Sequence, residues 1–188
     1  GVEHLAAGRL WLRAAEGERA QHHLHAAIEA LPDGWARDVR VGVAGGRIVS
    51  LETGVARNPA DEGGGGVALP GVANVHSHAF QRAMAGLTEK RGPGQDSFWT
   101  WRTLMYRFLD RLSPQDVESV AAMVMLEMAE AGYAAVAEFH YLHHAEDGAP
   151  YGNIAEMAQR IAEAAERSGI RLTLLPVLYA HSGFGGLL

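Results

Sequence analysis

The chain of 188 residues contains no cysteine. This absence excludes disulfide bridges and thiolate chemistry, and it restricts any metal site to histidine, aspartate and glutamate ligands. No apolar run approaches the ~20 residues that a membrane-spanning helix needs. An excess of positive charge is also lacking, since the formal net charge is −6. The charge balance therefore gives no reason to expect nucleic acid or a membrane as a partner.

Two sequence signals are also missing. Residues 1–30 carry charges throughout and lack the apolar core of a signal peptide, so a cytoplasmic location is expected. The glycine-rich residues 181–186 lack the G-x-G-x-x-G pattern of a dinucleotide site. The whole chain is 48% hydrophobic and 20% charged, a composition typical of a globular protein with one sizeable core.

Local patterns predict a hairpin followed by alternating strands and helices. Polar and apolar residues alternate on both sides of a glycine turn at 44–46, which indicates a β-hairpin, and the Pro/Gly/Asp-rich residues after it indicate an exposed loop. Ser113 and Asn153 are expected to cap helices. The expected elements are a hairpin over 38–51, a loop over 58–66, buried strands over 67–75, 134–142 and 170–179, and helices over 95–110, 114–132 and 153–169.

Strands that alternate with helices predict βαβ units and a parallel sheet. The three expected strands end near His78, His143 and His181, each with polar residues at its C-terminal end. Ligands of α/β folds bind at that edge of the sheet. A complete eight-unit barrel usually needs about 250 residues, so the chain is short for one.

His76 and His78 are the strongest candidates for metal ligands. Residues two apart on a strand share a face, so the two imidazoles are expected to point to one place. Neutral imidazole is a good zinc ligand, and a catalytic zinc site uses about three protein ligands and one open position. The sequence therefore predicts two ligands of one divalent metal ion at the end of this strand.

Other polar residues near the strand ends allow two interpretations each. His140, which shares a strand face with Glu138, is either a metal ligand or a hydrogen-bonded core residue. Tyr141 either donates its hydroxyl to a substrate carboxylate or simply packs. Gln81 either reaches into a pocket or lies on a helix surface. Arg102, among aromatic residues, either stacks on them or clamps a carboxylate through two parallel hydrogen bonds.

The residues also carry a family resemblance. Leu69-Pro70-Gly71, Asn74 and the His-x-His pair are similar to the first-strand metal motif of the amidohydrolase superfamily. Within that superfamily the chain resembles the formimidoylglutamate deiminases of histidine degradation, from about Leu31 to its last residue. The stretches that carry this second resemblance are residues 76–83, 98–106, 137–144 and 179–186.

The resemblance implies an α/β fold, namely the N-terminal part of a metal-dependent-hydrolase (β/α)8 barrel with a small β-sandwich subdomain. Residues 1–25 have no counterpart in that family and are an unassigned extension. Their histidines at 22, 23 and 25 either bind a metal ion opportunistically or belong to a solvated segment; the second interpretation is preferred, and they are kept outside the site. Residues 26–66 form the β-subdomain, and residues 67–188 form the first βα units of an incomplete barrel.

The resemblance also implies chemistry. The reaction is the metal-dependent hydrolysis of N-formimidoyl-L-glutamate to N-formyl-L-glutamate and ammonia. His76 and His78 hold one divalent metal ion, zinc being the expected one. Gln81, Arg102 and Tyr141 hold the glutamate portion of this small-molecule substrate.

The remaining ligands and the catalytic residue are expected beyond Leu188, so this chain by itself is expected to be inactive, and the complete protein is expected to be a homodimer. Two alternatives stay open, a purine-type deaminase of the same superfamily and a catalytically silent partial domain.

Overall fold

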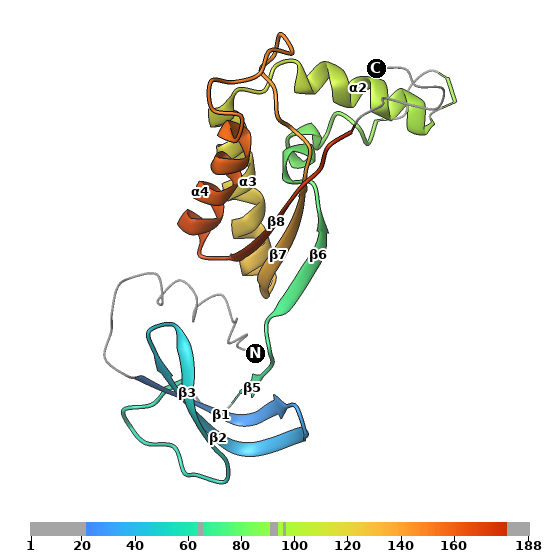
Figure 1. Ribbon diagram of the computed structural model, residues 1–188. Helices are drawn as coiled ribbons and strands as arrows, with labels where there is room; N and C mark the ends of the chain where they lie inside the picture. Colours follow the sequence, from blue (N-terminus) through green and yellow to red (C-terminus); the bar gives the residue numbers. More distant parts are fainter. Residues whose placement is uncertain (1–21, 64–65, 91–93, 96, 180–188) are drawn as a thin grey trace. The chain divides into compact units, whose positions relative to one another are not determined.

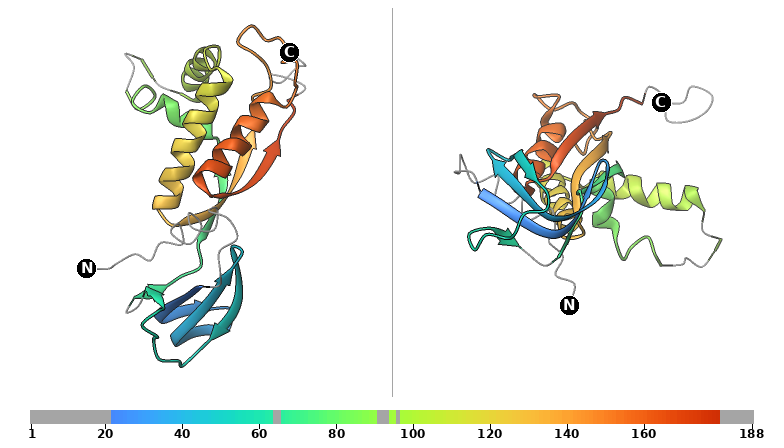
Figure 2. Two further views of the ribbon diagram at one scale, coloured as in Figure 1. Left: turned by 90° about the vertical axis from the view of Figure 1, so that its left-hand side faces the viewer. Right: turned by 90° about the horizontal axis from the view of Figure 1, so that it is seen from below.

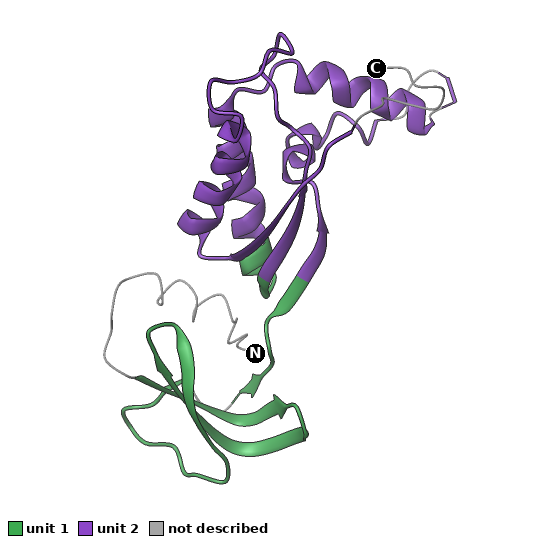
Figure 3. Cartoon of the chain, in the orientation of Figure 1, with its two compact units in different colours: residues 1–73, 128–134 green, residues 74–127, 135–188 purple. Residues whose placement is uncertain are grey.

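The structure is a computed structural model that describes residues 22–63, 66–90, 94–95 and 97–179. The chain divides into two compact units (Figure 3). The β-unit comprises residues 1–73 and 128–134, and the αβ-unit comprises residues 74–127 and 135–188. Among the described residues, no helix is long and apolar enough to cross a membrane.

The β-unit is built on one sheet with the strand order β3-β2-β1-β4, in which β5 also pairs with β1. The predicted hairpin is confirmed, since β2 and β3 pair antiparallel with Val43 opposite Ile48. Valines on one face of β2 form the core of this sheet. The strands are β1 His22–Leu31, β2 Gly34–Ala44, β3 Arg47–Glu52, β4 Glu62–Gly63 and β5 Val67–Ala68.

The structure differs from the sequence-based expectation in the kind of sheet and in the residue at which the β-subdomain begins. The five strands β1 to β5 join one sheet, so the β-sandwich is not confirmed. The histidines before residue 26 belong to β1, which pairs with β2 from His22 opposite Val43 onward. His25 is buried, and its Nε2 lies 2.9 Å from the Val55 carbonyl oxygen. The interpretation of residues 22–25 as a solvated segment was therefore wrong, and the β-subdomain begins at least as early as His22.

The single buried strand expected over residues 67–75 was also wrong. Residues 67–68 form β5 in the β-unit, and a new strand, β6, runs over Val72–Ser77 in a different sheet. Pro70 lacks a backbone N–H, and Gly71 favours a bend, so together they interrupt the strand. Val75 is 80% exposed, which contradicts the expected burial of this strand.

The αβ-unit has a three-stranded sheet with the order β6-β7-β8, where β7 is Tyr133–His140 and β8 is Arg171–Pro176. Strands β7 and β8 are parallel. Helix α3, Pro114–Glu130, precedes β7, and helix α4, Glu156–Ser168, connects β7 to β8. The two helices lie side by side on one face of the sheet (Figures 1 and 2). This arrangement confirms the predicted βαβ units. The short 3-10 helix η1, Ala79–Met84, and helix α2, Phe98–Leu109, follow β6.

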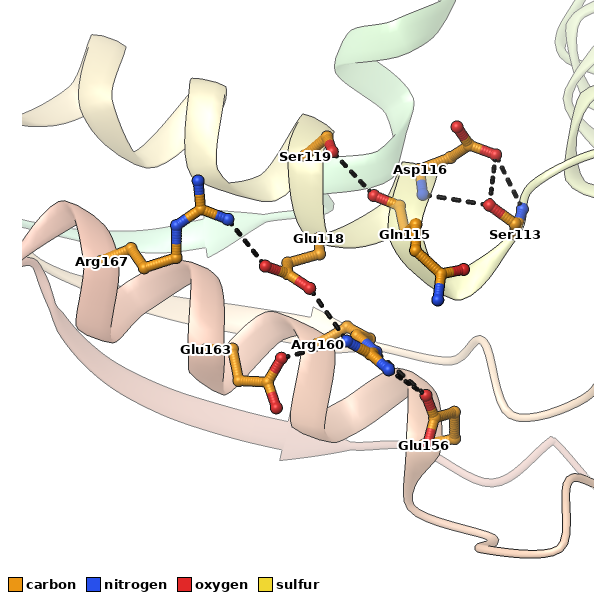
Figure 4. A network of polar contacts seen from close by, with 9 residues as sticks. All are labelled: Ser113, Gln115, Asp116, Glu118, Ser119, Glu156, Arg160, Glu163 and Arg167. Carbon is orange, nitrogen blue, oxygen red and sulfur yellow. Dashed lines mark hydrogen bonds and ion pairs between the residues drawn. The ribbon is translucent and has the colours of Figure 1, made fainter.

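Helices α3 and α4 are joined by ion pairs. Glu118 of α3 binds both Arg160, at 3.1 Å, and Arg167, at 2.7 Å, of α4 (Figure 4). Hydrogen bonds from the two guanidinium groups hold the pKa of Glu118 below its usual range. The core residues that these helices bury are Val117, Ala121, Val124 and Met125 on α3, and Met157, Ile161, Ala164 and Ala165 on α4.

The helix ends follow local sequence signals in two of three places. Ser113 caps α3 as predicted, because its hydroxyl accepts from the Asp116 N–H at 3.2 Å and the Asp116 carboxylate accepts from the Ser113 N–H at 3.0 Å. Gly169 ends α4 at φ 73°, a left-handed conformation that glycine adopts at little cost. Asn153 only caps the turn before α4, since its Oδ1 accepts from the Ala155 N–H and the helix begins at Glu156.

Replacing Ser113 with alanine should lower the free energy of unfolding by about 1 kcal/mol, because the first turn of α3 loses an acceptor for its N–H groups. Urea unfolding followed by circular dichroism measures this difference. Ser119→Ala on the same helix is the matched control, since the Ser119 hydroxyl bonds only to Gln115 within the helix and should change stability by less than about 0.5 kcal/mol. An equal loss in both variants would contradict a specific capping role.

Candidate functional site

The two histidines of the His-x-His pair lie together at the C-terminal end of β6. The rings of His76 and His78 are in edge contact, with their centroids 5.1 Å apart. His76 is exposed, whereas His78 is partly buried. Among the described residues, no group of three His, Asp or Glu side chains is close enough to hold a metal ion. The described chain thus offers a pair of ligands rather than a complete metal site.

The His78 ring is oriented by the neighbouring strand. Its Nδ1 lies 3.2 Å from the carbonyl oxygen of Phe139 on β7, and the Phe139 ring contacts the imidazole at 5.2 Å. A carbonyl oxygen only accepts hydrogen bonds, so this contact requires the proton on Nδ1. The Nε2 lone pair is then directed outward, which is the state in which a histidine binds a metal ion.

A buried carboxylate lies on the opposite face of β7. Glu138 is 1% exposed, and its Oε1 accepts a hydrogen bond from the Ala79 N–H at 2.7 Å. Burial raises the pKa of Glu138, while hydrogen bonds from Ser77 and Ala79 act in the opposite direction. The sequence predicts Glu138 near the end of this strand but gives no sign of its contact with η1. The available signal was a carboxylate inside an otherwise apolar strand.

Two of the three predicted substrate residues are brought together. Gln81 on η1 donates from Nε2 to the Tyr141 hydroxyl oxygen at 3.2 Å, and the Tyr141 hydroxyl donates to the Met105 sulfur of α2 at 3.7 Å. Burial raises the pKa of Tyr141, so this hydroxyl stays protonated at neutral pH. The Tyr141 ring also contacts the His78 ring at 5.6 Å. Gln81 and Tyr141 therefore adjoin the histidine pair.

Arg102 lies on α2 and contacts aromatic residues of its own helix. Its guanidinium lies 5.8 Å from the Trp99 ring centroid and donates from Nη2 to the Tyr106 hydroxyl at 3.0 Å. These residues and Thr103 line a surface pocket of about 430 Å³. The stacked conformation shows the packing role and leaves the carboxylate-binding role as a prediction.

His140 does not join the histidine pair. It is 3% exposed and shares a face of β7 with Glu138 and Val136, whereas Phe139 contacts His78 from the other face. Its ring contacts His143, at 5.4 Å between centroids. Burial and the neighbouring His143 lower the pKa of His140 from 6.5 to about 4. The structure therefore favours the interpretation of His140 as a core residue. His181, near the end of the third expected strand, lies outside the described residues.

Acid should destabilise the fold through His140. Because its pKa is lowered on folding, the neutral form stabilises the folded state fully above about pH 6.5, and this stability is lost as the pH falls toward about 4. A shift of this size corresponds to about 3 kcal/mol. The variant His140→Phe should lose less stability over that range, as measured by urea unfolding at several pH values. His144→Gln, at an exposed position, should keep the wild-type slope; equal slopes in all three proteins would contradict this assignment.

Comparisons with known proteins place these residues in a family. The family model described as "Amidohydrolase family" matches residues 67–182, and the model "Formimidoylglutamate deiminase HutF, N-terminal domain" matches residues 21–65. The formimidoylglutamate deiminase of Pseudomonas aeruginosa is 54% identical over 156 residues, which cover 83% of this chain and 34% of that protein. The chain thus spans about a third of this curated relative.

Solved structures agree in fold. An amidohydrolase from Brucella melitensis matches with a TM-score of 0.83 and 57% identity, covering 88% of this chain and 37% of that chain. An atrazine chlorohydrolase from Arthrobacter aurescens, solved with zinc, matches with a TM-score of 0.63 and 19% identity, covering 82% of this chain and 35% of that one. The resemblance inferred from sequence is confirmed, and the chain belongs to the amidohydrolase family.

Proposed function

We propose that this chain is the metal-binding and substrate-binding N-terminal part of an enzyme that hydrolyses N-formimidoyl-L-glutamate to N-formyl-L-glutamate and ammonia. The observation that carries the proposal is the 54% identity to a formimidoylglutamate deiminase across 83% of the chain. Contacts among His76, His78, Gln81 and Tyr141 support it, because the two proposed metal ligands adjoin two of the proposed substrate-binding residues.

The histidine pair fits a divalent metal ion, for which we propose zinc. With Nδ1 of His78 directed at the Phe139 carbonyl oxygen, Nε2 remains for the metal, and His76 adds a second imidazole beside it. A bound divalent ion would supply Lewis-acid activation of water for the attack on the formimidoyl carbon. The further ligands and the general acid–base carboxylate are proposed to lie in the part of the relatives that this chain does not cover.

The residues of this chain are proposed to bind and orient the substrate. Formimidoylglutamate carries two carboxylates, and carboxylates are bound well by a guanidinium through paired hydrogen bonds. Arg102 is proposed to supply that charge. The Tyr141 hydroxyl, which burial keeps protonated, can donate to a carboxylate oxygen, and Gln81 fixes that hydroxyl by its own hydrogen bond. The cytoplasmic location and the homodimer stay predictions.

A chimera tests the proposal. In it this chain replaces the matched third of the Pseudomonas aeruginosa deiminase, so that the missing ligands are supplied. We expect the purified chimera to release ammonia from formimidoylglutamate and to form N-formylglutamate. Guanine and related purines serve as the competing substrates. A folded, metal-loaded chimera that deaminates a purine and leaves formimidoylglutamate intact would contradict the proposal.

A further inference from the structure

The residues on both sides of His78 hydrogen-bond to the buried side chain of Glu138. The Ala79 N–H, directly after His78, donates to Glu138 Oε1 at 2.7 Å, and Ser77, directly before His78, also hydrogen-bonds to this carboxylate. Ser77 and Ala79 are themselves buried. At His78 the chain leaves the strand, with φ −132° and ψ 77°, and enters η1. Glu138 therefore contacts the chain on both sides of His78, the residue between β6 and η1.

Packing in the core does not by itself explain a carboxylate at position 138. Val136, two residues earlier on the same face of β7, is apolar and 2% exposed, so this face is part of the core. Burying a carboxylate costs free energy unless hydrogen bonds compensate. Part of the compensation comes from the donors that flank His78, whereas Oε2 of Glu138 has no hydrogen-bond partner among the described residues. The hydrogen bonds that the acid does make are thus to the backbone and side chain of this turn.

Phe139 and Tyr141 orient the imidazole ring of the same histidine. The Phe139 carbonyl oxygen accepts from His78 Nδ1 at 3.2 Å, and the rings of Phe139 and Tyr141 contact the imidazole at 5.2 and 5.6 Å. This contact is possible only when the turn after β6 keeps His78 beside β7. The buried acid thus holds the chain on both sides of His78, while the carbonyl oxygen of the next residue of β7 accepts the hydrogen bond from the His78 ring.

We propose that Glu138 is a positioning residue, whose carboxylate holds the turn from Ser77 to Ala79 so that His78 keeps its Nδ1 hydrogen bond to Phe139 and presents Nε2 to the metal ion. The inference rests on the proposed metal-dependent function and specifies how its ligand is oriented. It assigns no contact between Glu138 and substrate or metal.

The test uses the full chain, zinc alone as the probe, and four variants. Glu138→Gln keeps an acceptor for the Ala79 N–H, Glu138→Leu removes it, and Val136→Ala disturbs the same core face as a matched control. His78→Gln identifies the His78 signals and the zinc binding that depends on it. Long-range ¹H–¹⁵N NMR spectra report which His78 nitrogen carries the proton, and isothermal titration calorimetry reports zinc affinity.

We expect the Nδ1–H tautomer of His78 in the wild type, in Glu138→Gln and in Val136→Ala. In Glu138→Leu the signal should move toward the Nε2–H tautomer, and the His78-dependent zinc affinity should fall by about 10- to 100-fold, the usual effect of losing a residue that orients a metal ligand. Glu138→Gln should restore most of that affinity.

The wild-type spectrum alone can overturn the proposal, even if Glu138→Leu does not fold, because an Nε2–H tautomer of His78 in the metal-free chain contradicts it. An equal loss of zinc affinity in Glu138→Leu and Val136→Ala would also overturn it. Failure of the proposed function is distinguishable, since it would appear as a chimera that leaves formimidoylglutamate intact while the His78 tautomer and its dependence on Glu138 remain as expected.

Discussion

Replacing His78 with glutamine should abolish metal binding and deiminase activity of the chimera. The imidazole Nε2 is one of the two metal ligands that we propose among the described residues, and the ring is oriented by the hydrogen bond from its Nδ1 to the Phe139 carbonyl oxygen. Because residues that merely orient a ligand already change metal affinity by about 10- to 100-fold, loss of the ligand itself should weaken zinc binding by more than about 100-fold. Zinc content after dialysis and ammonia release from formimidoylglutamate measure the two effects.

The matched control is His144→Gln, which makes the same chemical change at an exposed histidine of the loop after β7. We expect its zinc content and activity to equal those of the parent chimera. If His78→Gln retained stoichiometric zinc and wild-type activity, the assignment of the His-x-His pair as metal ligands would be wrong.

Replacing Arg102 with methionine in the chimera should raise KM for formimidoylglutamate while zinc content stays unchanged. Methionine keeps an unbranched side chain that can still pack beside Trp99, but it removes the charge that pairs with a substrate carboxylate. Loss of one charge-assisted hydrogen-bonded pair costs about 1.5–3 kcal/mol, which corresponds to a KM increase of about 10- to 150-fold. Steady-state kinetics with ammonia detection measure KM and kcat separately.

Arg107→Met is the control, since Arg107 is an exposed arginine on the same helix. Its KM should stay within about twofold of the parent, as expected for a surface substitution worth less than about 0.5 kcal/mol. A KM for Arg102→Met equal to that of the control would leave Arg102 with the stacking role that its contacts with Trp99 and Tyr106 already show.

Local patterns in the sequence predicted the elements whose cause is local. The hairpin over 38–51, the Ser113 cap and the alternation of strands and helices follow from side-chain periodicity and turn residues within a few positions. The adjacency of His76 and His78 follows from the two-residue repeat of a strand. The errors at residues 67–75 and at Asn153 arose where a Pro-Gly pair or a turn competed with an apolar pattern.

Contacts between distant residues needed the structure. Glu138 and Ala79 are 59 positions apart, and Gln81 and Tyr141 are 60 apart. Both contacts depend on the placement of β7 next to β6, which no local pattern specifies. The sequence likewise left two roles open for His140, and only its burial on the face that carries Val136 distinguishes them.

Anomalous scattering at the zinc edge, from crystals of the zinc-loaded chimera, tests the central claim most directly. The account predicts one strong peak in contact with His76 and His78, at about 2.0–2.1 Å from each ligating nitrogen, with the Nδ1 of His78 still beside the Phe139 carbonyl oxygen. A fully occupied zinc peak at any other place in the chimera, with none at this histidine pair, would contradict it.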